Sequence, residues 1–448
     1  MLKRLVPALD TLRASETGKA VGLAGAMIVN NGIALVASVV FARMLTDYGA
    51  LAALVSYLLI LTVVGQALQV ATARDGVLGR LGRGSDLVAT LERWGWSLGA
   101  FTVVATIASI LLRQPIADLV GVPRQQWAAA AGIPAGCAFL AVSIMRGALQ
   151  GTGDYRVVGI SLIGEQSIRL VAGVVLAVIG LKVTGAFLGS LVAYIAMTAY
   201  CMLRLRARLG VQRTTGRGVS AFGLWRHVRL AAVAIAALAV IQFLQNIDLI
   251  IAKHQFSDRV ASSYAVAAVA AKVLIWVAMG AGFYLVPECS RLRSMGGDTR
   301  PVLLRAVGII AVCAVPCLLI FAVGAHPLLQ IVFGRRRAIA SASLLPLGAA
   351  FTVLAGTYLA VQYMLALHRS KFLIAIGLVA AVEPVLLLQA PRNPAGFATV
   401  VLGVQAVGAV LAFGLALRPL RRGRVAAPAA PPAAPPPVLH AAEPDRSG

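Results

Sequence analysis

The chain has 448 residues, of which 60% are hydrophobic and only 12% are charged, and its mean hydropathy is +0.88. Soluble domains carry about 25% charged residues, so this composition excludes an ordinary soluble protein and predicts a polytopic membrane protein. The net charge of +24 does not indicate a nucleic-acid partner, because the basic residues lie between apolar runs rather than on one soluble face.

Residues 1–19 come first, and their leucines at near-helical spacing beside basic residues predict a short amphipathic helix on the cytoplasmic membrane surface. Twelve apolar runs follow, each of about the 17–25 residues that cross a bilayer, or slightly more. Each run must be helical, because lipid offers the backbone no hydrogen-bonding partners. The predicted spans are Ala20–Ala42, Ala50–Ala73, Gly95–Leu112, Trp127–Leu149, Val157–Gly180, Val183–Leu203, Leu230–Ala252, Val260–Val286, Val302–Val323, Ile339–Leu367, Phe372–Ala390 and Gly396–Leu417.

The orientation follows from the basic residues in the connections. Most of the 40 Lys and Arg residues fall in connections that would be cytoplasmic if the N-terminus is inside, so both termini are predicted to be cytoplasmic. The exception is the cluster Arg335, Arg336 and Arg337, which would lie outside. Residues 204–229 form the longest basic connection, suited to anionic lipid headgroups. The Pro- and Ala-rich tail, residues 418–448, is predicted to be disordered.

The chain also carries the trace of an internal duplication. Pro115, Gly121 and Pro134 recur 212 or 213 residues later as Pro327, Gly334 and Pro346. This offset divides the spans into two sets of six, residues 20–203 and residues 230–417. An even number of spans per copy makes both copies enter the membrane from the same side. The expected fold is therefore all-α, with two parallel six-helix lobes around a central cavity.

Polar residues inside the spans are the candidates for function, because lipid excludes them unless they are paired or face water. Two readings apply to Glu165 and Arg169, which lie four residues apart on one helix face: a buried structural ion pair, or part of a substrate cavity. Lys272 and Glu383 have no such local partner, which favours a water-filled cavity. The remaining candidates are Asp248, which could pair with Lys272, and the adjacent pair Asn30 and Asn31.

Catalysis has little support in the sequence. No His residue pairs with acidic residues at metal-ligand spacing, no Gly-x-x-x-x-Gly-Lys-Ser/Thr motif for nucleotides is present, and four of the five cysteines lie inside apolar runs. We therefore expect no enzyme activity and no cofactor. An unpaired cation at the depth of Lys272 suits an anionic group such as a phosphate.

Three stretches carry a resemblance to a known family. Asn246–Ser257 resembles the second-lobe entry of polysaccharide flippases of the multidrug/oligosaccharidyl-lipid/polysaccharide exporter superfamily. Arg146–Tyr155 resembles the junction of their fourth and fifth spans, and Phe41–Gly49 resembles the end of their first span. The likeness extends over all twelve spans. It implies alternating access in the bacterial cytoplasmic membrane and movement of a lipid-linked oligosaccharide, commonly on polyprenyl diphosphate, to the outer leaflet.

The resemblance also implies roles and partners. Lys272, with Arg169 and Arg146, would attract the diphosphate, and Glu165, Glu383 or Asp248 would carry a proton or balance the cations. Whether H+ or Na+ drives the cycle stays open. The expected partners are the lipid-linked oligosaccharide, anionic membrane lipids and polysaccharide assembly enzymes.

Other transporters and enzymes were weighed as alternatives. A cation-coupled multidrug antiporter of the same superfamily often has an acidic residue in the first span, where this chain has Asn30 and Asn31. Peptidoglycan-precursor flippases resemble a fourteen-span variant. A major-facilitator transporter would need a loop motif that Gly76–Arg83 matches only in part. A membrane glycosyltransferase or acyltransferase would need acidic or His clusters at the membrane surface.

Overall fold

A computed structural model describes residues 16–210, 223–295, 297–367 and 369–418. The predicted helix of residues 1–19 and the tail after 418 lie almost wholly outside these residues. Ten helical stretches of the described chain are long and apolar enough to cross a membrane, and one of them, Tyr155–Leu209, contains two helices. With the shorter apolar helix Phe372–Leu388, the twelve predicted spans are accounted for.

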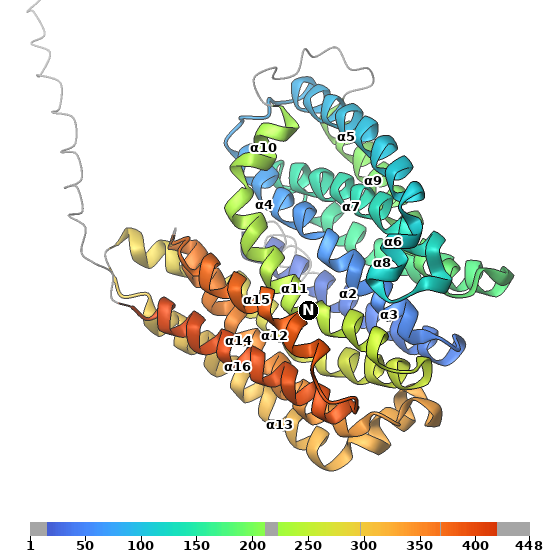
Figure 1. Ribbon diagram of the computed structural model, residues 1–448. Coiled ribbons are helices and arrows are strands. Elements are labelled where there is room, and N and C mark those ends of the chain that lie inside the picture. The colour runs from blue at the N-terminus through green and yellow to red at the C-terminus, as the bar shows by residue number, and fades with distance from the viewer. Residues whose placement is uncertain (1–15, 211–222, 296, 368, 419–448) are drawn as a thin grey trace, which may run out of the picture. The chain divides into compact units, whose positions relative to one another are not determined.

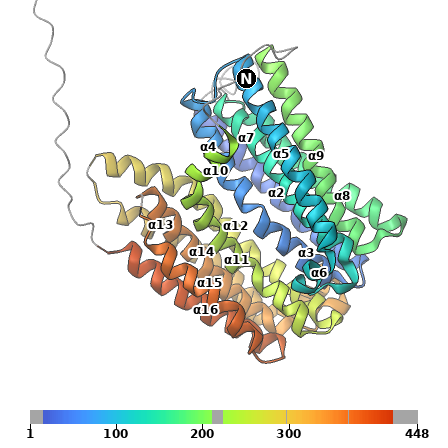
Figure 2. The same cartoon turned by 45° about the horizontal axis from the view of Figure 1, so that its top comes forward.

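The helices of the first lobe cover residues 16–209, and the two lobes occupy separate regions in both views of the molecule (Figures 1 and 2). The helices are α2 (Glu16–Met44), α3 (Tyr48–Leu61), α4 (Val63–Val77), α5 (Ser85–Leu111), α6 (Arg113–Val120), α7 (Gln126–Gly151), α8 (Tyr155–Leu176) and α9 (Lys182–Leu209). Helix α7 packs against α4, α5 and α9, and α8 packs between α2 and α9.

The second lobe consists of α11 (Ala232–Gln255), α12 (Asp258–Ser294), α13 (Arg300–Phe333), α14 (Leu344–Ala366), α15 (Phe372–Leu388) and α16 (Pro394–Ala416). Here α14 packs against α12, α13 and α16, and α15 packs against α11 and α16. The connection between the lobes contains more helix than the predicted linker of residues 204–229. Helix α9 continues to Leu209, and a short helix, α10 (Leu224–Leu230), precedes α11.

Small residues allow the helices of the first lobe to approach closely. A Cβ atom added to Gly189 of α9 would lie 2.6 Å from the backbone nitrogen of Gly173 in α8. A Cβ atom on Gly147 of α7 would lie 2.5 Å from the carbonyl oxygen of Gln69 in α4. Such contacts matter in lipid, where helices associate through van der Waals packing rather than through the hydrophobic effect.

The sequence repeat corresponds to a repeated structural feature. Gly121 directly follows α6 with φ of 77°, and Gly334 directly follows α13 with φ of 96°, a region that favours glycine. Pro115 lies in α6 and Pro327 lies in the last part of α13, beyond a break in helical geometry at Gly324. The last part of α13 therefore corresponds in position to α6, and each is followed by a glycine with positive φ, although ψ is 25° at Gly121 and 156° at Gly334.

Candidate functional site

The two lobes enclose a central cavity of about 340 Å³. Helices α2, α3, α4, α8 and α9 line it from the first lobe, and α11 and α12 line it from the second. Four of the predicted residues reach this cavity: Asn30, Asn31, Arg169 and Lys272. The structure thus brings together residues separated by up to 242 positions in the chain.

Two cations, one from each lobe, give the cavity its charge. Arg169 of α8 is half-buried, and Lys272 of α12 is 9% exposed. The Lys272 ammonium donates a hydrogen bond to Oδ1 of Asn246 at 3.0 Å and lies 5.5 Å from the ring centroid of Phe351. The described residues that line the cavity include no carboxylate, so the site carries a net positive charge and suits an anionic ligand.

Amide side chains make up most of the remaining polar lining. They come from both lobes and can donate and accept hydrogen bonds, as binding of sugar hydroxyls requires. Asn246 is fixed by a hydrogen bond from its Nδ2 to the carbonyl oxygen of Gln242 at 2.8 Å. The full set is Asn30, Asn31, Gln66, Gln166, Gln242, Gln245 and Asn246. The other five were not predicted as site residues. They could have been found from the sequence, because each is a polar residue that interrupts an apolar run.

Glu165 and Arg146 do not reach the cavity, because they bind each other inside the first lobe. Glu165 Oε2 lies 2.8 Å from Nη1 of Arg146, and the two side chains are 7% and 2% exposed. Arg146 also donates to Oγ and to the carbonyl oxygen of Ser161, at 2.8 and 2.9 Å. Of the two readings left open for Glu165 and Arg169, their mutual ion pair is therefore not the one that the structure shows. A cation on α7 takes the carboxylate, so Arg169 is left to face the cavity.

Asp248 and Glu383 lie within the second lobe and do not line the cavity. Asp248 Oδ2 accepts a hydrogen bond from the Tyr264 hydroxyl at 3.2 Å, and Glu383 Oε1 accepts one from Nε2 of Gln405 at 3.1 Å. No ion pair within 4 Å joins Lys272 to either carboxyl among the described residues, and the Lys272 ammonium bonds Asn246 instead, so the structure does not show the alternative pairing of Asp248 with Lys272. The second carboxyl oxygen of each acid lacks a hydrogen-bond partner in the described structure.

At the helix ends that the sequence predicts to lie outside, the lobes are joined by two arginines that bind backbone carbonyls across the interface. Arg43, near the end of α2, donates to the carbonyl oxygens of Ile331 and Val332 at 2.7 to 3.0 Å. In return Arg337, just after α13, donates to the carbonyl of Ala42 in the last turn of α2 and to the carbonyls of Leu45 and Thr46 directly after it. The last carbonyls of a helix have no hydrogen-bond partner within the helix, and they form the negative end of its dipole. Each arginine therefore supplies both the missing hydrogen bonds and a positive charge at that end.

Side-chain ion pairs reinforce this closure. Lys253 of α11 lies 2.8 Å from Asp47 of the first lobe and 2.6 Å from Asp258 of its own lobe. The backbone nitrogen of Gly49 donates to Oγ of Ser262 at 2.9 Å. These contacts, with those of Arg43 and Arg337, form what we term the outer clamp. They explain why the basic cluster 335–337 lies on the predicted outer side, since Arg337 is buried in the interface.

Two parallel six-helix lobes around a polar central cavity define the fold of a class of membrane transporters. No family model matches the chain, and no curated protein is similar to it in sequence. Among solved structures, the chain is similar to the lipid II flippase MurJ in an inward closed conformation, with a TM-score of 0.69, 14% identity and coverage of 88% of this chain and 87% of that one.

Multidrug exporters share the same fold. An inward-facing MATE family transporter of the MOP superfamily gives a TM-score of 0.68 at 11% identity, covering 88% of this chain and 96% of that one. The eukaryotic MATE transporter AtDTX14 gives 0.59 at 15% identity, covering 90% and 96%. The fold predicted from the sequence is confirmed by these structures, whose low identity carries the likeness no further than the fold.

Proposed function

We propose that the protein is a flippase that moves a lipid-linked oligosaccharide, carried on a polyprenyl diphosphate, from the cytoplasmic to the outer leaflet. The observation that carries the proposal is the chemistry of the central cavity. Arg169 and Lys272 approach from opposite lobes, and seven amide side chains accompany them without a carboxylate among the described lining residues. Diphosphate requires the cations, and sugar hydroxyls suit the amides.

The same chemistry argues against the multidrug antiporter alternative. Cationic drugs are bound best by carboxylates, and the three acidic residues predicted for the cavity are buried elsewhere. Glu165 is neutralised by Arg146, and Asp248 and Glu383 point into the second lobe. The printed description of one structural neighbour as a lipid II flippase supports a lipid-linked substrate for this fold, without specifying this chain's substrate.

Transport by this design requires the cavity to open alternately to each side of the membrane. In this proposal the outer clamp closes the outer side of the cavity, and substrate enters from the cytoplasmic side. To release the head group outside, the contacts of Arg43, Arg337 and Lys253 must break. In this proposal the protein lies in the bacterial cytoplasmic membrane with both termini inside, and works beside polysaccharide assembly enzymes and anionic lipids.

Ion coupling in the proposal centres on Asp248 and Glu383. Both carboxyl groups are fully buried, and each retains one oxygen without a hydrogen-bond partner among the described residues. A buried carboxyl group without a cation in direct contact is stable when it is protonated or binds a small cation. Asp248 lies on α11 and Asn246, the partner of Lys272, is two residues away. In this proposal, a change of protonation or cation occupancy at Asp248 therefore affects the cavity through Asn246 and its hydrogen bond to Lys272.

The test is flipping of a fluorescent lipid-linked oligosaccharide by the protein in vesicles. Lys272→Ala and Arg169→Ala should each reduce the initial rate at least tenfold, because each removes one charge-assisted contact with the diphosphate, worth about 1.5 to 3 kcal/mol. Lys371→Ala, at an exposed position outside the cavity, is the matched control and should retain the wild-type rate. Transport of a cationic dye but not of the oligosaccharide lipid by the wild-type protein would overturn the proposal.

A further inference from the structure

The central cavity contains an aromatic side chain to which the proposed function assigns no role. Trp276 of α12 lies one helical turn beyond Lys272, and both residues line the cavity. The indole is half-buried and packs partly against the surrounding core. Within the described residues it makes no hydrogen bond and no contact with another ring. Trp276 therefore offers the cavity an apolar ring and an N–H donor.

The level of Trp276 in the cavity follows from the contact between α11 and α12. These helices are consecutive spans joined by a short connection, so they cross the membrane in opposite directions. The hydrogen bond from Lys272 to Asn246 marks where they face each other. One turn farther from their connection, α11 places Gln242 and α12 places Trp276 on the cavity wall. Gln242 and Trp276 thus lie one turn from the cation, on the side predicted to be cytoplasmic.

The first lobe has the same order of groups on α8. Gln166 precedes Arg169 by three residues on one helix face, and both line the cavity. Because α8 begins at its predicted cytoplasmic end, Gln166 also lies one turn from its cation on the cytoplasmic side. Each lobe therefore presents a cation and, one turn away, an amide. Trp276 adds an aromatic ring to the amide level of the second lobe.

Two amide oxygens that line the cavity have no hydrogen-bond partner among the described residues. They are Oε1 of Gln245, a residue that is 6% exposed, and Oδ1 of Asn30 in the opposite lobe. A buried acceptor without a donor destabilises a protein, so its presence in a cavity points to a donor that arrives with the ligand. An ionised diphosphate only accepts hydrogen bonds. The donor must therefore be a hydroxyl or N–H group elsewhere in the ligand.

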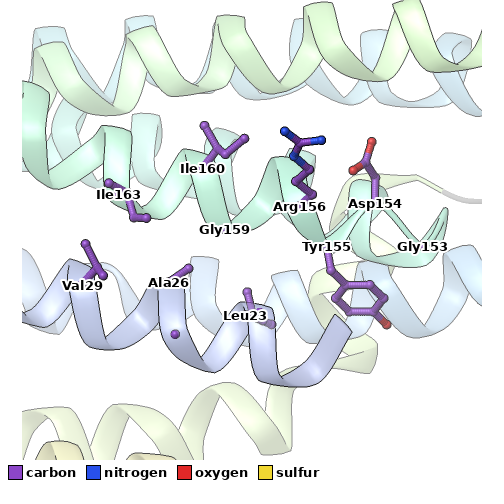
Figure 3. Close-up of a pocket in the computed structure, with 12 residues that line it drawn as sticks. Leu23, Ala26, Val29, Gly153, Asp154, Tyr155, Arg156, Gly159, Ile160 and Ile163 are labelled. Carbon is purple, nitrogen blue, oxygen red and sulfur yellow. The ribbon is translucent and has the colours of Figure 1, made fainter. Parts of the chain in front are cut away.

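This combination of groups distinguishes the central cavity from a larger one. A cavity of about 620 Å³ lies between α2 and α8 within the first lobe (Figure 3). Its walls are largely apolar, with Leu23 and Val29 from α2 and Ile160 from α8 among them. No amide side chain and no tryptophan is found among its described lining residues, and it shares none of them with the central cavity. Volume alone therefore does not select a site for a polar head group.

We propose that Trp276 and Gln245 form the subsite for the sugar that is linked directly to the diphosphate. The inference rests on the proposed function and identifies how the oligosaccharide of that substrate is recognised. A pyranose ring has C–H groups on its faces and hydroxyl groups around its rim. The indole of Trp276 packs against one face, and Oε1 of Gln245 accepts from a rim hydroxyl or an acetamido N–H. The diphosphate, one turn away, stays within reach of Lys272.

The test uses the full-length protein in nanodiscs and compares polyprenyl diphosphate with the same lipid carrying one glucose or one N-acetylglucosamine. Trp276→Ala should weaken binding of the preferred sugar-bearing lipid at least tenfold and leave binding of the bare lipid unchanged. Trp276→Phe should recover most of the affinity, because it keeps a flat apolar ring. Trp96→Ala is the matched control. Trp96 is 82% exposed and does not line the cavity, so all affinities should be retained.

A second variant separates recognition by Gln245 from a structural role. Gln245→Met removes the unpartnered oxygen, so the thermal stability of the empty protein should be maintained or rise. Binding of the sugar-bearing lipid should weaken severalfold, with the bare lipid unaffected. A loss for the N-acetylglucosamine form alone identifies the acetamido N–H as the donor, and a loss for both forms identifies a hydroxyl. Lower stability with unchanged sugar discrimination would overturn the role of Gln245.

The remaining outcomes separate failure of the subsite from failure of the proposed function. Wild-type protein that binds none of the three lipids refutes the proposed function itself. Equal wild-type affinity for all three, or an equal loss for all three in Trp276→Ala, refutes the subsite alone. If Trp276→Ala does not assemble, tryptophan fluorescence decides. The sugar-bearing lipid should change the emission of the wild-type protein but not that of Trp276→Phe, and the same change in both proteins overturns the contact.

Discussion

Removal of one partner from the buried ion pair between Arg146 and Glu165 should destabilise the first lobe severely. In Glu165→Gln the guanidinium of Arg146, whose side chain is 2% exposed, loses its 2.8 Å carboxylate contact and keeps only its two bonds to Ser161. Loss of one member of a buried pair costs about 3 to 5 kcal/mol, because the remaining charge is left uncompensated. Replacement of both by apolar residues, as in Arg146→Met with Glu165→Leu, should be close to neutral.

The assay is the temperature at which the purified protein loses its monodisperse peak in size-exclusion chromatography. The single variant should aggregate well below the wild-type temperature, and the apolar double variant should recover most of the difference. A second double variant, Glu165→Gln with Arg169→Met, should recover none, because Arg169 does not bind Glu165. A wild-type profile for Glu165→Gln, or rescue through Arg169, would refute the reasoning.

Three further predictions concern the clamp, the connection and the lobe interior. Arg337→Met removes the hydrogen bonds to the end of α2, so labelling of an Asn31→Cys probe by an outside, membrane-impermeant maleimide should rise severalfold, and an unchanged rate would contradict the clamp's role. Burial lowers the pKa of His227, so the folded state resists protonation of this side chain. The free energy of unfolding should therefore fall as the pH drops below about 6.5, the ordinary pKa of histidine. His227→Gln should flatten this dependence in a thermal-shift series. Gly189→Leu should prevent assembly, since even a Cβ would lie 2.6 Å from Gly173, and a normal elution profile would disprove that packing.

The sequence predicted the fold well because its signals are local. Run length and charge bias require only a count along the chain, and the repeated Pro and Gly residues mark a helix that ends at a positive-φ glycine in each lobe, at Gly121 and Gly334. Pairing of buried charges depends instead on which helix faces which. The spacing of Glu165 and Arg169 is compatible with an ion pair, yet the cation of α7 is closer, and no spacing rule contains that information.

The cavity residues likewise divide into those with a local sequence signal and those that depend on how the helices face each other. Lys272 and Arg169 could be selected from the sequence because charges are rare in spans, and both line the cavity. The Gln residues that surround them were not selected, because a single amide in an apolar run is common enough to be ignored. Glu383 was placed in the cavity by its depth alone, and its depth does not determine the direction of its side chain, which bonds Gln405.

The outer clamp binds main-chain oxygens, and this has a consequence for how the protein tolerates change. Arg43 and Arg337 contact the same atoms whichever side chains stand at Val332 or Ala42. Natural variation at the ends of α2 and α13 should therefore leave closure intact, provided that the two arginines and the helix lengths are kept. An insertion of one residue in either helix would be far more harmful than most substitutions, because it would turn the accepting carbonyls by about 100° away from their donors.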